Sequence, residues 1–152
     1  MGQSMNISSI LDAAVEREEE AYKFYKDVAE RAKPRAVKDA FQELARDELG
    51  HRDFLKNCQK DPSLLNKLPV PKDYKVAEAT ESPRLSVDMK LVDAIALAMK
   101  REQEAAEFYQ KLAKTAADSK YQETFRGLAT MELGHKTRIE ALFMDMGYPE
   151  VW

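Results

Sequence analysis

The chain has 152 residues, 44% of them hydrophobic and 34% charged, with only 5 Gly and 6 Pro. This composition favours a helical protein with a buried core over a sheet protein or a disordered chain. The net charge of −3 gives no electrostatic basis for binding nucleic acid or an anionic membrane. A single cysteine, Cys58, excludes an internal disulfide and any site built from four thiolates. We expect one domain over residues 1–152, in the cytoplasm and with no membrane span.

The first half of the chain predicts two long helices. Helical periodicity covers residues 8–32, and Ser8 or Ser9 is the expected N-cap. A second periodic segment covers residues 35–59. Residues 60–85 contain four of the six prolines and have no clear period, so they predict a long connection.

The second half predicts another pair of helices. The third helix is expected to begin near Ser86 and to run to about Ala117. The fourth is expected to run from about Ser119 to Met146, because Gly147 after it is a typical helix stop signal.

The two halves of the sequence repeat each other in register. "REEEAYKFY" at 17–25 matches "REQEAAEFY" at 101–109, and "FQELARDELGH" at 41–51 matches "FRGLATMELGH" at 125–135. Chance can align alanines and glutamates in two helices, but it seldom aligns Phe-Tyr and Glu-Leu-Gly-His as well. We interpret the chain as a duplicated helical hairpin.

This organisation predicts an all-α fold. The hairpin repeats cover 8–59 and 86–146, and the 60–85 connection is long enough to cross from one to the other. Four long helices with short, long and short connections favour a ferritin-like four-helix bundle.

Each expected helix places polar residues in the middle of its apolar face. The second helix shows this most clearly, with Phe41, Leu44, Glu48, His51 and Leu55 at helical spacing. A buried carboxylate is costly without a partner, so this pattern requires compensation. The inward-facing polar set is Glu18, Glu48, His51, Glu102, Glu132 and His135.

These six side chains predict a site for two metal ions. Two divalent cations would balance four carboxylates and two neutral imidazoles, and oxygen-plus-imidazole ligation favours iron or manganese, although zinc can bind the same groups. One Glu from each of two helices and Glu-x-x-His from the other two is the di-iron bundle pattern. A lone Glu-x-x-His is often only a surface pair, but here the motif occurs twice in register. Tyr25 and Tyr109, two turns after Glu18 and Glu102, either support ligand carboxylates or are structural.

The motifs "REEEAYKFY", "ARDELGH", "REQEAAEFY" and "ATMELGH" resemble the rubrerythrin branch of the ferritin-like superfamily. The resemblance implies that the six predicted ligands bind two irons. It also implies reduction of hydrogen peroxide, or oxidation of ferrous iron by oxygen or peroxide, in defence against oxidative stress.

The sequence departs from the typical rubrerythrin pattern in two places. It lacks the four-cysteine rubredoxin-like site, so electrons would come from an external, rubredoxin-like donor protein. Ala105 stands where typical rubrerythrins carry an extra glutamate, so the resemblance implies metal binding more directly than peroxidase turnover. It also implies a homodimer, in which the long connection permits exchange of hairpins.

Other functions fit the same residues. The chain could be a non-catalytic iron-handling protein, a structural protein whose bundle is held by a metal such as zinc, or a manganese catalase-like enzyme. The sequence favours the di-iron oxidoreductase, with the iron-handling protein as the alternative.

Overall fold

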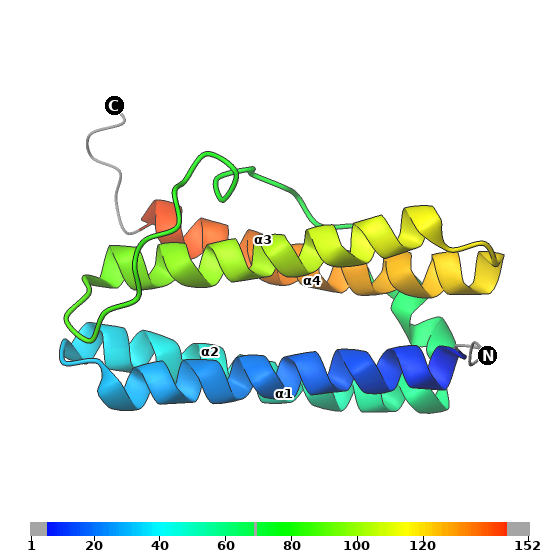
Figure 1. The fold of residues 1–152 in the computed structure, drawn as a ribbon, viewed down its shortest axis with the longest axis horizontal. Helices are drawn as coiled ribbons and strands as arrows, with labels where there is room; N and C mark the ends of the chain where they lie inside the picture. The colour runs from blue at the N-terminus through cyan, green and yellow to red at the C-terminus, as the bar shows by residue number, and fades with distance from the viewer. Residues whose placement is uncertain (1–5, 69, 146–152) are drawn as a thin grey trace.

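The computed structural model describes residues 6–68 and 70–145, and every regular element in this part of the chain is a helix (Figure 1). Four long helices and one short 3-10 helix follow each other along the chain. The helices α1 and α2 form one antiparallel layer, and α3 and α4 form a second layer against it. The predicted all-α four-helix bundle is therefore confirmed. The bounds are α1 Ile7–Arg31, α2 Arg35–Lys60, η1 Pro62–Lys67, α3 Leu91–Thr115 and α4 Ser119–Asp145.

The first helix begins slightly earlier than the sequence predicts. Asn6 is its N-cap, and the Asn6 side-chain oxygen accepts a hydrogen bond from the Ser9 amide at 2.7 Å. The expectation of Ser8 or Ser9 as the cap is therefore wrong, and both serines lie in the first turn. Asparagine caps a helix as well as serine does, so the sequence offered no basis for choosing between them.

The third helix begins at Leu91, five residues after the expected start at Ser86. The residues before it dock on the turn between α1 and α2 instead of continuing the helix. The Lys33 amide in that turn donates to the Val87 carbonyl at 2.9 Å, and Ser86 accepts from the Asp88 amide at 3.2 Å. A contact between distant segments thus outweighs the local cap signal. The expected end of α4 near Met146 and Gly147 falls outside the described residues.

Apolar side chains fill the bundle on both sides of its middle. One cluster includes Tyr25, Phe41 and Ile95, and the other includes Leu11, Leu55 and Cys58. Cys58 is fully buried and packs as a small apolar side chain, as expected. Between these two clusters lies a polar layer, which contains the predicted metal ligands.

The segment between the hairpins is attached to α4 at two places. Leu65 of η1 packs so closely on Gly127 that a Cβ atom there would lie 2.7 Å from the Leu65 Cβ. Further along, Lys136 forms ion pairs with three carboxylates, and we call these four residues the Lys136 cluster: Lys136, Asp73, Glu78 and Glu140. Among the described residues, no helix is long and apolar enough to cross a membrane.

Candidate metal centre

Four glutamates, one from each long helix, meet in the polar layer at the middle of the bundle. Glu18 comes from α1, Glu48 from α2, Glu102 from α3 and Glu132 from α4, and each is 5% exposed or less. Helical spacing places each carboxylate on the inward stripe of its helix, between apolar residues one turn on either side. Four buried carboxylates in one layer repel each other strongly unless protons or cations neutralise them.

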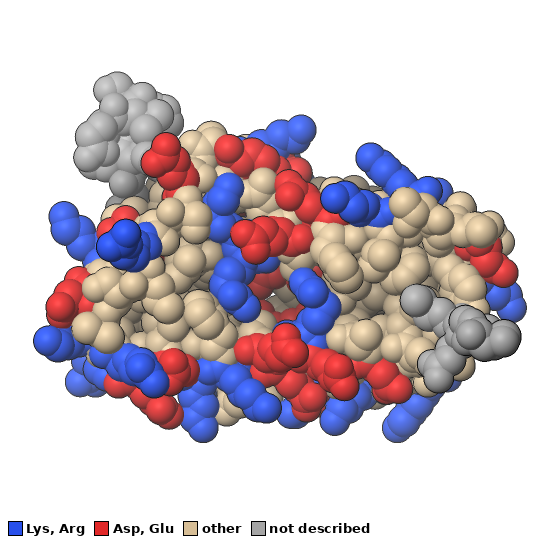
Figure 2. Space-filling model, in the orientation of Figure 1, with Lys and Arg blue, Asp and Glu red and all other residues tan. Residues whose placement is uncertain are grey.

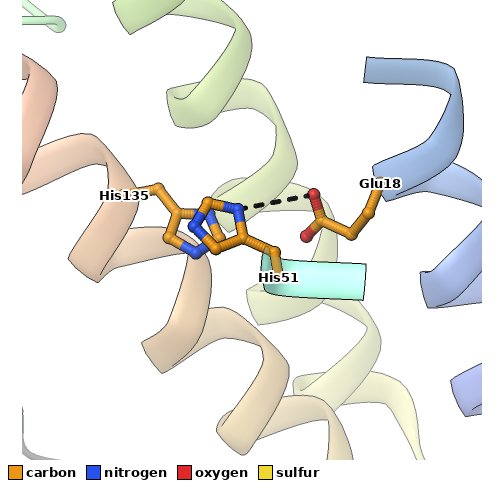
Figure 3. Close-up of side chains that lie close together, drawn as sticks. All are labelled: Glu18, His51 and His135. Atoms are coloured by element: carbon orange, nitrogen blue, oxygen red, sulfur yellow. Dashed lines mark ion pairs between the residues drawn. The ribbon is translucent and has the colours of Figure 1, made fainter. Parts of the chain in front are cut away.

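The two histidines lie beside these carboxylates and stack on each other. The ring centroids of His51 and His135 are 3.3 Å apart, and the ring planes differ by 11° (Figure 3). The Nδ1 atom of His51 lies 3.4 Å from Glu48 and 3.9 Å from Glu18, the residue drawn with it. Nδ1 of His135 lies 3.1 Å from Glu132 and 3.7 Å from Glu102. Each histidine thus faces one glutamate from its own helix and one from its hairpin partner.

Two buried polar atoms at this site have no hydrogen-bond partner in the described part of the chain. They are Oε1 of Glu132 and Nδ1 of His135, which lie 3.1 Å apart without hydrogen-bond geometry between them. A buried polar atom left unpaired is costly, so native proteins rarely contain one without a ligand or water. An oxygen and an imidazole nitrogen this close together are a typical donor set for a transition-metal ion once the nitrogen has lost its proton.

Burial and mutual repulsion shift the pKa values of the carboxyls. Burial, reinforced by the nearby Glu132 charge, raises the pKa of Glu18 well above its usual range, and the pKa of Glu102 is raised for the same two reasons. Burial also raises the pKa of Glu48 to about 9. Without metal, Glu18 and Glu48 therefore hold protons near neutral pH.

The pKa values of the two histidines and of Glu132 shift in other directions. Burial, reinforced by the His135 charge, lowers the pKa of His51 to about 3, so this imidazole is neutral and ready to bind a metal. Burial opposes a charge on His135 and Glu132 as well, but their mutual attraction outweighs it, which raises the pKa of His135 and lowers that of Glu132. The metal-free site thus holds one imidazolium–carboxylate pair.

The two predicted supporting tyrosines are both buried. Tyr25 is 1% exposed and Tyr109 is 4% exposed. Burial, reinforced by the nearby Glu102 charge, raises the pKa of Tyr25, and burial with the Glu132 charge raises that of Tyr109. Both phenols therefore keep their protons and lie near the carboxylates. Their role in supporting the ligands stays a prediction.

A pocket of about 160 Å³ opens from the carboxylates toward the face formed by α1 and α3. Ala21 and Ala105 form part of its wall, and Arg17 and Arg101 lie beside them. Figure 2 shows this face, with a hollow near its middle that contains acidic side chains and has basic side chains at its edge. The sequence interpretation missed both arginines, although each directly precedes a predicted ligand in the repeated motif.

The structure brings all six predicted ligands into one layer. Two subsets have donor atoms within 4.8 Å of one another, namely Glu18, His51 and His135, and Glu102, Glu132 and His135. The ligand assignment itself stays a prediction. A third group with this spacing, Asp73, Glu78 and Glu140, contains its own cation in Lys136.

Comparison with known proteins agrees with this geometry. The family model for rubrerythrin matches residues 9–143. The chain belongs to the rubrerythrin family. A search of curated proteins gave no match. Among solved structures, a hypothetical protein from Pyrococcus furiosus is 28% identical, with a TM-score of 0.50, and the match covers 92% of this chain and 89% of that one.

Membership of the rubrerythrin family indicates which kind of site this polar layer is. The family is characterised by carboxylate and histidine ligation of iron in a ferritin-like bundle, and this chain has matching donor groups at the same level of all four helices. The chain therefore carries a site with the chemistry of metal binding, and its rubrerythrin domain spans both hairpins.

Proposed function

We propose that this rubrerythrin-family chain is a di-iron oxidoreductase that reduces hydrogen peroxide or reacts with oxygen, with electrons from an external donor. The observation that carries the proposal is the buried pair Glu132 Oε1 and His135 Nδ1, which have no hydrogen-bond partner among the described residues. These atoms lie beside three further buried glutamates, and no lysine or arginine in the described part of the chain forms an ion pair with any of the four.

Charge balance supports two divalent ions. The four glutamates carry four negative charges when ionised, and the imidazoles are neutral when they bind a metal. Two divalent cations cancel that charge without any contribution from the rest of the protein. Iron fits the donor set and the family, and manganese or zinc could bind the same groups.

The contacts support a division of roles among the ligands. Glu48 contacts both Glu18 and Glu102, and Glu132 also contacts Glu18. We propose that all six side chains would hold the two ions, with Glu18 and His51 nearer one ion and Glu102 and His135 nearer the other.

The protein's contribution to the reaction follows from this placement. When bound, the two irons supply the electrons that reduce peroxide to water. The two apolar clusters keep bulk water away from the ligands along the bundle axis. The phenols of Tyr25 and Tyr109 keep their protons, so each can donate a hydrogen bond to a ligand carboxylate and fix its orientation.

The proposal also covers the electron donor and the oligomeric state of the protein. The single cysteine cannot form a thiolate-bound iron site, so we propose a separate rubredoxin-like protein as the electron donor. We also propose a cytoplasmic homodimer. Exchange of hairpins between two copies is compatible with the connection from 61 to 90, which separates the hairpins along the chain.

The test is to purify the protein without oxygen, measure iron per chain, and add one equivalent of hydrogen peroxide. We expect about two irons per chain and rapid oxidation, with a new near-ultraviolet absorption band. Oxidation no faster than that of free ferrous iron would refute the oxidoreductase. The variant Glu132→Gln should retain its helix content and lose both iron and the reaction.

One observation favours an alternative, a non-catalytic iron-handling protein. Alanine stands at positions 21 and 105 in the pocket beside the ligands, so neither position supplies an extra carboxylate to follow an iron that changes its position. In this case two irons would bind and stay inert toward stoichiometric peroxide. The same peroxide experiment therefore separates the two functions.

A further inference from the structure

The pocket beside the metal centre has two cations at its edge that the proposed redox function does not use. Arg17 on α1 and Arg101 on α3 are equivalent residues of the two repeats, and both line the pocket. Within the described part of the chain, neither guanidinium forms an ion pair with a carboxylate. Nε of Arg101 is buried and has no hydrogen-bond partner there.

Aromatic rings hold each arginine in place. The guanidinium carbon of Arg17 lies 4.5 Å from the centre of the Phe108 ring, and that of Arg101 lies 4.0 Å from the centre of Phe24. Each arginine thus stacks on a phenylalanine of the other hairpin. A guanidinium that stacks through its flat face keeps the N–H groups at its edge free to donate, and that edge matches the oxygens of a carboxylate or phosphate.

The charge inside the pocket determines what could bind. With two divalent ions present, the ligand set is neutral, so Arg17 and Arg101 are opposed only by Glu20 among the charged residues that line the pocket and are not ligands. Without metal, the same pocket ends on four carboxyls. A pocket of about 160 Å³, walled by Ala21 and Ala105, has room for a small polyatomic anion.

We propose that this pocket is a binding site for a small oxyanion, a carboxylate or a phosphate, which Arg17 and Arg101 hold against the metal centre. The site rests on the proposed metal centre, because the pocket opens onto the four ligand glutamates, which repel an anion unless metal ions or protons neutralise them. Binding energies are reciprocal, so to the extent that bound metal favours the anion, the bound anion favours metal.

The experiment uses zinc-loaded protein, freed of excess zinc, because zinc occupies the centre without redox chemistry. Metal content is measured first, and acetate and inorganic phosphate are then titrated separately by calorimetry. We expect at least one of them to bind, and we expect the double variant Arg17→Gln/Arg101→Gln to weaken that binding at least tenfold.

The control is Lys23→Gln/Lys111→Gln, which removes the same charge from exposed positions on the same two helices. This control should bind the anion like the wild type. A zinc-loaded wild type that binds neither anion would overturn the oxyanion site, and so would an equal loss in the control. Either result leaves the metal centre standing, whereas a failure of the proposed function appears separately, as missing metal or as iron inert toward peroxide.

The variant Arg17→Lys/Arg101→Lys tests whether the shape of the guanidinium contributes to anion binding in addition to its positive charge. It keeps both positive charges and loses the planar donor edge. We expect anion affinity between that of the wild type and that of the glutamine variant. Helix content by circular dichroism identifies any variant that has lost its fold, and affinity for zinc in the presence and absence of the anion gives a second readout of the same coupling.

Discussion

Two groups of carboxylates in this bundle have their negative charge compensated in different ways. The Lys136 cluster contains its own cation, since the Lys136 ammonium lies 2.9 Å from Glu78 and 3.1 Å from Glu140. The metal centre places four glutamates together, and in the described part of the chain no lysine or arginine forms an ion pair with them. The first group is complete as folded, and the second needs something from outside the chain. The comparison teaches that an acidic cluster indicates a metal only where the protein has left the charge uncompensated.

The sequence repeat sharpens this contrast. The metal ligands occur in both hairpins, whereas Lys136 and Glu140 align with Arg52 and Lys56 in the first hairpin. Arg52 pairs with Asp53 near the surface, at 3.0 Å. The metal site is therefore shared by both repeats, and the Lys136 cluster belongs to the second repeat alone, where it anchors the connecting segment.

The largest expected effect on stability comes from Lys136→Met. Removal of one partner from a buried ion pair leaves the other charge uncompensated, and Glu140 is fully buried here. We expect the free energy of unfolding to fall by about 3–5 kcal/mol, measured by urea denaturation. Arg52→Met, at the equivalent position of the first hairpin, should cost less than about 1 kcal/mol. Equal losses of stability in the two variants would show that the Lys136 cluster stabilises the fold no more than the Arg52–Asp53 ion pair does.

A pair of glutamate-to-glutamine variants tests the comparison directly in metal-free protein. Glu140 accepts hydrogen bonds from the amides of Tyr74 and Ala77 at 3.2 and 3.0 Å, so Glu140→Gln should destabilise the fold by about 2–3 kcal/mol. Glu48 has a pKa near 9 and is already protonated at neutral pH. Glu48→Gln should therefore change stability by less than about 1 kcal/mol.

Metal binding should reverse the order of these two variants. Glu48→Gln should lose metal, because an amide replaces a ligand that must be ionised, while Glu140→Gln should keep it. Zinc content and the midpoint of thermal unfolding measure this. Loss of zinc from both variants, with helix content retained, would mean that the two clusters are not independent.

The pH dependence of the metal-free protein should follow from the raised pKa values at the centre. Folding favours the protonated carboxyls, so their contribution is complete at low pH and is lost as the pH rises toward the folded-state pKa, about 9 for Glu48. The lowered pKa of His51 acts in the opposite direction, but only below its ordinary value of about 6.5.

The melting temperature of chelator-treated protein should therefore fall between about pH 6.5 and 9. Each carboxyl with a raised pKa lowers the free energy of unfolding by at most about 1.4 kcal/mol for each unit that the pH rises in this range. Zinc-loaded protein should not show this fall, since metal binding strengthens as protons leave the ligands. A melting temperature of the metal-free protein that rises across this range would contradict the assignment.

How far the sequence predicts the molecule depends on whether a feature lies within one helix. All six predicted ligands lie together because each is one helical turn from the next apolar residue of its own helix. Lys136 and Glu140 were missed because a lysine and a glutamate four residues apart look like a surface pair, and their partners Asp73 and Glu78 lie in a segment without period. The start of α3 was missed for a similar reason, since the Val87 carbonyl pairs with the distant Lys33 amide.

The smallest expected effect concerns the contact between Leu65 of η1 and Gly127 of α4. Gly127→Ala places a methyl group 2.7 Å from the Cβ of Leu65, so η1 or α4 must shift. Overpacking costs about 1–3 kcal/mol, partly offset by the better helix propensity of alanine, and we expect a net loss of about 1 kcal/mol.

The matched control is Gly50→Ala, where nothing lies within 4 Å of the added methyl group. It should stabilise the fold by about 0.5–1 kcal/mol through helix propensity alone. Thermal unfolding of both variants in metal-free form checks this difference, and a stabilised Gly127→Ala would show that η1 does not pack on α4 this closely.

The measurement that tests the account most directly is the anomalous diffraction of iron-loaded crystals at the iron absorption edge. We predict two peaks in the polar layer, one beside Glu18 and His51 and the other beside Glu102 and His135, and none in the Lys136 cluster. A single peak outside this layer, or iron between Asp73, Glu78 and Glu140 with an unoccupied layer of glutamates, would contradict the claim that the uncompensated carboxylates are the metal centre.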